Sequence, residues 1–229
     1  MDLEDIIAQI EQELTWRVEE LFFLRNQLVN IQDEQDKMRY RKSLVVMLYS
    51  YYEGFCKAAF LIYIDAINKL NLQRNLVNEY IQAVSLHEVF RNYHNESKKS
   101  PYFNKLSPDD SKLHRFSRQV EFVMAMEQLW KEIVAIPEEV VDTESNLKPV
   151  VLRKILFRLG FQHNCFKKNE GMISHLLERR NNVAHGAQKE GLSKEDYEEI
   201  EKATLEIMRQ LKSLIVDALL NKSYLKKSS

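Results

Sequence analysis

The segment 175–188, HLLERRNNVAHGAQ, places an arginine, an amide and an imidazole within one short stretch that ends at a glycine. These residues are Arg180, Asn181, His185 and Gly186. Histidine accepts and releases protons near neutral pH, and arginine is a permanent planar cation suited to phosphate oxygens. Together they could drive attack of a ribose 2′-hydroxyl on the adjacent phosphodiester. His185 would move the proton, Arg180 would stabilise the charge on phosphorus, and Asn181 would orient either group.

The spacing of these residues limits how one chain could use them. Five residues on a regular helix place Arg180 and His185 about 140° apart, so they do not share one face. Either the helix loosens at its end and the two side chains converge, or a second copy completes the site across a two-fold axis. The same three residues also fit a polar helix end with no chemistry, and spacing alone does not separate these readings.

The local charge favours a phosphate-rich ligand such as RNA. Residues 148–185 contain eight Lys or Arg and two Glu, a local charge of +6 in a chain whose net charge is −1. Residues 186–206 return to −4. The positive potential is therefore expected around the motif, and we expect Arg179, Lys154 and Arg158 to contact the substrate.

The other titratable residues suggest no metal centre. Glu53 could support Arg180 as a buried polar partner, although a helical pair with Lys57 is the alternative. His163 and Cys165 supply only two possible ligands, which do not make a zinc site. We therefore expect neither a metal nor another cofactor.

The composition indicates a helical protein of 229 residues with a substantial core. Apolar residues make up 45% of the chain, and its five glycines and four prolines are too few for a many-turned β-protein. Cys56 and Cys165 have no CxxC spacing, which favours reduced thiols and a cytoplasmic location. The acidic N-terminal sequence does not resemble a signal or transit peptide.

The most apolar segment, residues 43–67, is expected to be the central helix of a bundle. Charges inside a membrane span are costly, and this segment contains Glu53, Lys57 and Asp65. We therefore predict no membrane span. The tyrosine cluster in the same segment is expected to pack in the core and at a dimer interface, and consists of Tyr49, Tyr51 and Tyr52.

Apolar periodicity predicts an all-α, antiparallel helical bundle with an inserted helical and loop segment. One domain, residues 1–229, would have a core of about 1–70 and 145–220 and an insertion of about 72–140. Gly186 is expected to end the motif helix, and Ser193 with Asp196 reads as a capping box. The predicted helices cover residues 3–31, 36–70, 72–90, 113–135, 147–160, 171–185 and 194–220, with loops at 92–112 and 136–149.

Three segments carry a resemblance to a known family. The sequence LLERRNNVAHG resembles the R-N-x-x-x-H signature of the HEPN superfamily, the higher eukaryotes and prokaryotes nucleotide-binding domains. The segments RKSLVVMLYSYYEGFCKAAF and SNLKPVVLRKILFRLGF are similar to the MAE-like branch of that superfamily. The resemblance covers roughly residues 40–70 and 145–220, and it does not place residues of about 72–140.

The resemblance implies a helical dimer in which two motifs share one cleft. Many HEPN proteins are metal-independent endoribonucleases of toxin–antitoxin or anti-phage systems, and others only bind nucleotides or RNA. The motif positions fall on Arg180, Asn181 and His185, so Arg180 is preferred over Arg179 as the motif arginine. The implied partners are RNA, a second copy of the chain, and an antitoxin or defence-system protein. A non-catalytic nucleotide- or RNA-binding module is the alternative function.

Overall fold

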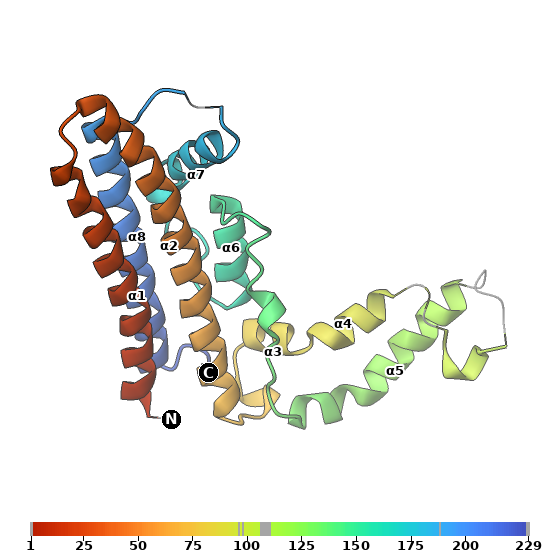
Figure 1. Cartoon of the computed structure of the whole chain (residues 1–229). Coiled ribbons are helices and arrows are strands. Elements are labelled where there is room, and N and C mark those ends of the chain that lie inside the picture. Colours follow the sequence, from red (N-terminus) through yellow and green to blue (C-terminus); the bar gives the residue numbers. More distant parts are fainter. Residues whose placement is uncertain (1, 96, 98, 106–110, 188, 228–229) are drawn as a thin grey trace.

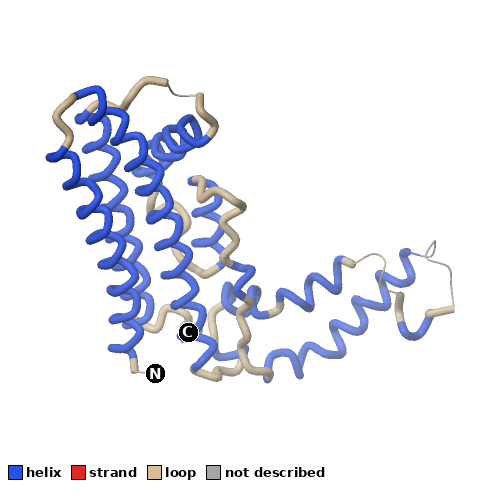
Figure 2. Tube along the Cα trace, in the orientation of Figure 1, coloured by secondary structure: helices blue, strands red, loops and turns tan. Residues whose placement is uncertain are grey.

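The computed structural model describes residues 2–227 except 96, 98, 106–110 and 188. Within these residues the chain forms eight α-helices and no strand (Figures 1 and 2). The predicted all-α class is therefore confirmed. Short 3₁₀ turns connect several of the helices, at Gln27–Asn30, Arg74–Leu76, Pro101–Phe103, Glu138–Val140 and Lys167–Asn169.

A long three-helix bundle forms the main body of the molecule. Helices α1 (Leu3–Asn26), α2 (Glu34–Lys69) and α8 (Lys194–Leu220) lie side by side, and α7 (Glu170–Ala184) packs across one end of α2 (Figure 1). Helix α6 (Pro149–Arg158) covers the same side of α2 further along. Helix α2 is central because it packs against α1, α7 and α8.

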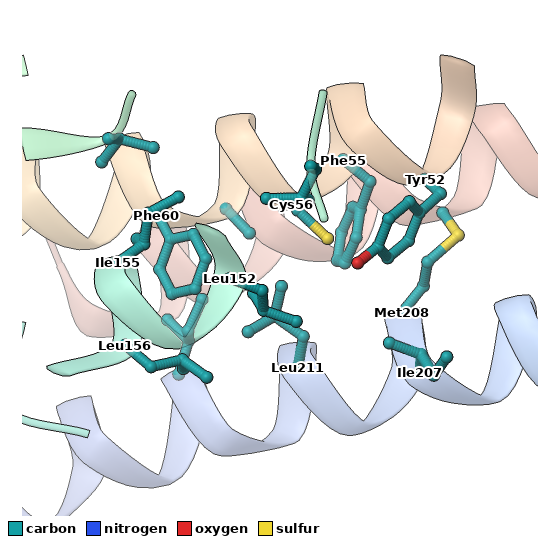
Figure 3. Close-up of a cluster of buried hydrophobic side chains, with 14 of the residues drawn as sticks. Tyr52, Phe55, Cys56, Phe60, Leu152, Ile155, Leu156, Ile207, Met208 and Leu211 are labelled. Carbon is teal, nitrogen blue, oxygen red and sulfur yellow. The ribbon is translucent and has the colours of Figure 1, made fainter. Parts of the chain in front are cut away.

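Apolar side chains around α2 explain its central place. Its aromatic residues meet side chains of α6 and α8 in one continuous core (Figure 3), which includes Tyr52, Phe55, Cys56, Phe60, Leu152, Ile155, Leu156, Ile207, Met208 and Leu211. A helix that is apolar on nearly every face must be covered on nearly every face. Among the described helices, only α2 is long and apolar enough to cross a membrane, and half of its most apolar window is buried. A core helix satisfies the same test.

The middle of the chain differs from the prediction of one helix over residues 72–90. The structure has two shorter helices there, α3 (Glu79–Ser85) and α4 (His87–His94), which meet at Leu86. Asn78 caps the start of α3 by accepting the Ile81 N–H. The segment before α3 forms no α-helix. It makes two isolated β-bridges, Gln73 with Ile133 and Val77 with Leu225, on either side of the 3₁₀ turn Arg74–Leu76.

Helix α5 (Ser111–Lys131) completes an arm that projects from the bundle (Figure 1). We use "arm" for α4 and α5 together. The predicted loop over 92–112 contains the last turn of α4 and the turn Pro101–Phe103, and its residues 106–110 lie outside the described residues. Arg74 fixes the base of the arm, since its buried guanidinium donates to Ser85 Oγ at 2.8 Å and pairs with Glu132 at 3.1 Å.

The N-terminus of α8 is capped differently from the prediction. Ser193 Oγ accepts the Asp196 N–H at 3.1 Å, as expected of an N-cap. The reciprocal half of the capping box is absent from the described bonds, because the Asp196 carboxylate pairs with Arg179 of α7 at 3.1 Å. The acidic first turn of α8 therefore ties this helix to the motif helix.

Candidate functional site

Helix α7 remains regular up to the motif histidine. The His185 N–H donates to the Asn181 carbonyl at 2.9 Å, which is ordinary α-helical bonding. Gly186 then adopts φ +68°. Its N–H donates to the Val183 carbonyl, and the Ala187 N–H donates to the Asn182 carbonyl. These are the two bonds of a Schellman motif, so the predicted end at Gly186 is confirmed. The helix does not loosen, and convergence of Arg180 and His185 within one chain finds no support.

Arg180 is held against the core by three neutral partners. Its guanidinium lies 4.6 Å from the centre of the Tyr49 ring. The Nη1 group donates to Asn146 Oδ1 at 3.0 Å and to Asn181 Oδ1 at 2.8 Å. The arginine is thus fixed by a cation–π contact and two amide oxygens, with its side chain partly buried.

Tyr49 links this arrangement to the turn before α6. Its ring is buried, and its hydroxyl accepts the Leu147 N–H at 2.8 Å. Burial and, next, the nearby Glu53 carboxylate raise the pKa of Tyr49 to about 12, against smaller lowering effects from the Leu147 N–H and Arg180. The hydroxyl therefore stays protonated at neutral pH, and the ring under Arg180 stays uncharged.

The positive charge of Arg180 has no carboxylate partner among the described residues. The partly buried Arg179 does have one, since it pairs with Asp196, and so does the buried Arg74, which pairs with Glu132. A fixed cation whose partners are all neutral retains its attraction for an added anion. The remaining N–H groups of Arg180 likewise have no hydrogen-bond partner in the described part of the chain.

His185 lies at the very end of α7 and is exposed. Its imidazole makes no hydrogen bond with any described residue. Glu53, expected either to support Arg180 or to pair with Lys57, forms an ion pair with neither of them within the described chain. Its carboxylate instead lies near the Tyr49 hydroxyl, one helical turn earlier on α2.

An open groove of about 600 Å³ runs between α6 and α7 beside the motif. Asn181 joins the two features, because its Oδ1 accepts from Arg180 while the residue lines the groove. The lining combines apolar, basic and amide side chains with one acid, and consists of Lys148, Pro149, Val150, Arg153, Ser174, Leu177, Glu178, Asn181 and Asn182. Such a mixture suits an unstacked base next to a phosphate.

The other basic residues expected to contact substrate have partners within the chain. Arg179 bonds to His175 Nε2 at 3.0 Å and to Asp196, and Lys154 pairs with Glu144 at 2.7 Å. Arg158, at the opposite end of α6 from the groove, donates to the Val140 carbonyl at 3.4 Å. The local excess of positive charge is therefore partly neutralised, and Arg180 is the motif cation left without an acid.

Two contributors, Asn146 and Tyr49, were not among the predicted site residues. Asn146 stands in the turn before α6, in the segment whose resemblance to the MAE-like branch was visible, but its role is not readable from that pattern. Tyr49 was expected only to pack. Both reach Arg180 across tertiary contacts between segments far apart in the sequence.

No group of three or more His, Cys, Asp or Glu that could hold a metal is present among the described residues. Cys56 is buried and Cys165 is exposed, and both are free. Burial raises the pKa of the Cys56 thiol far above its usual range, which makes it an unreactive core residue.

The Tyr49 hydroxyl should contribute measurably to stability. Tyr49→Phe keeps the ring under Arg180 but leaves the buried Leu147 N–H unpaired, which should lower the free energy of unfolding by about 1–3 kcal/mol. Urea denaturation measures this change. Tyr52→Phe is the matched control on the same helix, since the buried Tyr52 hydroxyl has no described partner and its loss should be neutral or stabilising. Equal losses in the two variants would contradict the assigned role of the hydroxyl.

Comparison with known proteins places the whole chain in one family. No curated protein and no solved structure matches the sequence. The family model of the MAE_28990-like HEPN domain matches residues 6–224, which includes the arm as well as the bundle and the motif. The chain therefore belongs to the MAE-like branch of the HEPN superfamily.

Proposed function

We propose that this protein is a metal-independent endoribonuclease whose active site is built from Arg180, Asn181 and His185 of two copies. The observation that carries the proposal is the state of Arg180. It is a fixed cation with neutral partners, one helical turn and a half from an exposed imidazole. A phosphodiester would supply the anion that this arrangement lacks.

The chemistry needs one guanidinium and one imidazole for each scissile phosphate. The ribose 2′-hydroxyl attacks phosphorus, and its proton passes to His185. Arg180 stabilises the added charge on the phosphoryl oxygens. The bond from phosphorus to the 5′-oxygen then breaks, and that oxygen takes a proton from water and leaves as a hydroxyl. The imidazolium returns its proton to water, leaving a 2′,3′-cyclic phosphate on the other product.

A homodimer is part of the proposal because α7 stays regular. Arg180 contacts the core while His185 stands exposed at the helix end, so a phosphate held by one side chain is out of line with the other in the same chain. Two α7 ends facing each other across a two-fold axis would bring the arginine of each copy toward the histidine of the other.

Cleavage should persist in EDTA and should yield 2′,3′-cyclic phosphate and 5′-hydroxyl ends. The reason is that the mechanism uses only side chains of the chain and the 2′-hydroxyl of the substrate. Purified protein is incubated with total RNA in EDTA, and the ends are identified by their response to phosphatase and kinase treatment. An identically purified His185→Ala protein is the control for contaminating nucleases. Strict dependence on added Mg²⁺ with 5′-phosphate products would sink the mechanism.

A non-catalytic module that binds RNA or nucleotides is the second candidate. It is favoured by the firm attachment of Arg180, which suits holding a phosphate, together with an imidazole that makes no hydrogen bond to any described residue. In that case RNA binding would require Arg180 and be unaffected by His185→Ala, with no cleavage in any variant. Filter binding and gels on the same samples distinguish the two functions.

The biological setting we propose is that of a toxin or anti-phage effector with an antitoxin or defence-system partner. The support for it is membership of the HEPN family. A cytoplasmic location belongs to the same proposal, and the free, exposed Cys165 agrees with a reducing compartment.

A further inference from the structure

Helix α5 carries apolar side chains on the face that points away from the rest of the chain. Phe116, Val123 and Met124 are 62%, 64% and 72% exposed, and Val120 is 39% exposed. Their spacing places all four on one helical face. We call Phe116, Val120, Val123 and Met124 the α5 stripe. A monomer rarely exposes such a contiguous apolar face without a partner for it.

The opposite face of the same helical turns is polar and buried. His114, Ser117 and Arg118 are less than 8% exposed. His114 Nδ1 accepts the Ser100 N–H at 3.2 Å, the hydroxyls of Ser100 and Ser117 lie 2.6 Å apart, and Arg118 Nε donates to the Tyr93 carbonyl at 3.2 Å.

The outer part of α5 is thus amphipathic in the reverse sense. A helix that packs on its own chain normally buries its apolar face and exposes its polar one. In the middle of α5 one apolar side chain does turn toward the chain, since Phe122 packs against Phe90 of α4 with ring centres 6.3 Å apart. The buried polar side chains of the inverted face end at Arg118, whereas the exposed apolar face continues to Met124.

We propose that a second copy of this chain covers the α5 stripe, with the two α5 helices antiparallel across a two-fold axis near Val120. This register sets Phe116 of each copy against Met124 of the other, and methionine sulfur packs favourably against aromatic rings. It also brings Lys112 of each copy beside Glu127 of the other. A parallel arrangement would instead set Lys112 against Lys112.

The charges at the two ends of the stripe are available for this pairing. Lys112 is exposed, and Lys131 of the same helix, at 2.6 Å on the surface, is the one ion-pair partner of Glu127 among the described residues. Exposed helical pairs of this kind contribute little, so exchanging Lys131 for Lys112 of a second copy costs little. The stripe is therefore self-complementary in chemistry and in charge.

This contact is separate from the dimer proposed at α7. The arm leaves the bundle near the end of α2 that lies far from α7 (Figure 1). Two different two-fold contacts on one chain join dimers into tetramers or longer assemblies. The α5 contact does not depend on catalysis, so its test is independent of ribonuclease activity.

Light scattering tests the contact through the mass of the assembly. Val123→Asp places a charge in the stripe and should lower the weight-average mass of the protein at least twofold. Arg115→Asp is the matched control, because Arg115 is exposed on the same helix but about 140° around from Val120. An unchanged mass for Val123→Asp would overturn the proposal. Circular dichroism confirms that both variants keep their helices.

Disulfide crosslinking tests the register. In a Cys165→Ser background, which removes the exposed thiol, Val120→Cys should form covalent dimers several-fold faster than Arg115→Cys. Lys112→Glu should slow this crosslinking, and adding Glu127→Lys should restore it by exchanging the two charges. Equal rates for Val120→Cys and Arg115→Cys would overturn the antiparallel contact between copies.

Discussion

Replacing either Arg180 or His185 by alanine should abolish most RNA cleavage. A positioned general base contributes roughly 10²–10⁴-fold, and loss of a donor to a developing oxyanion costs a comparable factor of about 10²–10³. Because both groups serve one transition state, the double variant should be little worse than either single variant. Initial cleavage rates of a labelled RNA measure all three proteins.

The structure predicts different effects of these substitutions on stability. His185 is exposed and unbonded, so His185→Ala should unfold like the wild type. Arg180 contacts Tyr49, Asn146 and Asn181, so Arg180→Ala should lower the free energy of unfolding by about 1–2 kcal/mol. Arg180→Lys should also lose activity, since an ammonium group cannot supply the planar fork.

Arg179→Ala is the matched control for these measurements. It removes the neighbouring arginine, whose charge is already paired with Asp196, and should cost stability while leaving most cleavage. It also tests Arg179 as the alternative motif arginine, which lies one residue further from His185 than Arg180 does. A stable and fully active His185→Ala protein would end the catalytic interpretation, and a greater loss in Arg179→Ala than in Arg180→Ala would move the site to Arg179.

Mixing the two inactive variants should restore activity. In a heterodimer of Arg180→Ala and His185→Ala chains, one intact arginine and one intact histidine remain, and they belong to different chains. If the site combines residues across the two-fold axis, that heterodimer contains one complete pair. With random assortment of chains, the recovered rate should reach up to roughly a quarter of the wild-type rate.

Differently tagged chains, co-expressed and purified through both tags, provide the heterodimer. The control is a heterodimer in which one chain carries both substitutions and the other carries His185→Ala, because it retains no histidine and should stay inactive. If a verified heterodimer of the two single variants is no more active than its parents, Arg180 and His185 act within one chain, and the composite site is wrong.

The sequence by itself determined the helical class and most helix positions in the bundle. Apolar residues at helical spacing locate α1, α2, α7 and α8 to within a few residues, because the same stripe that marks a helix also drives its packing. Gly186 fixed the end of α7, since φ +68° there suits glycine without a side-chain cost. The motif and the two flanking segments were sufficient to identify the HEPN family.

Local pattern was insufficient wherever a polar group had several possible partners. Asp196 looked like half of a capping box, but its carboxylate pairs with Arg179, because α7 passes close to the start of α8. Glu53 was assigned to Arg180 or Lys57, yet it lies near Tyr49. A long charged side chain reaches residues that sequence spacing does not reveal, so only the tertiary arrangement selects among them.

The tertiary structure alone decided what surrounds Arg180 and what α5 exposes. The packing of α7 against α2 and the turn before α6 sets the arginine on Tyr49 and Asn146. Asn146 is 34 positions from Arg180 in the chain, and Tyr49 lies on another helix, α2. On α5 the spacing of the apolar residues predicts a helix, but it does not predict which side of that helix packs against the rest of the protein. Buried hydrogen bonds of His114, Ser117 and Arg118 fix the polar side inward, because polar groups buried without partners are costly, and the apolar stripe is left outward.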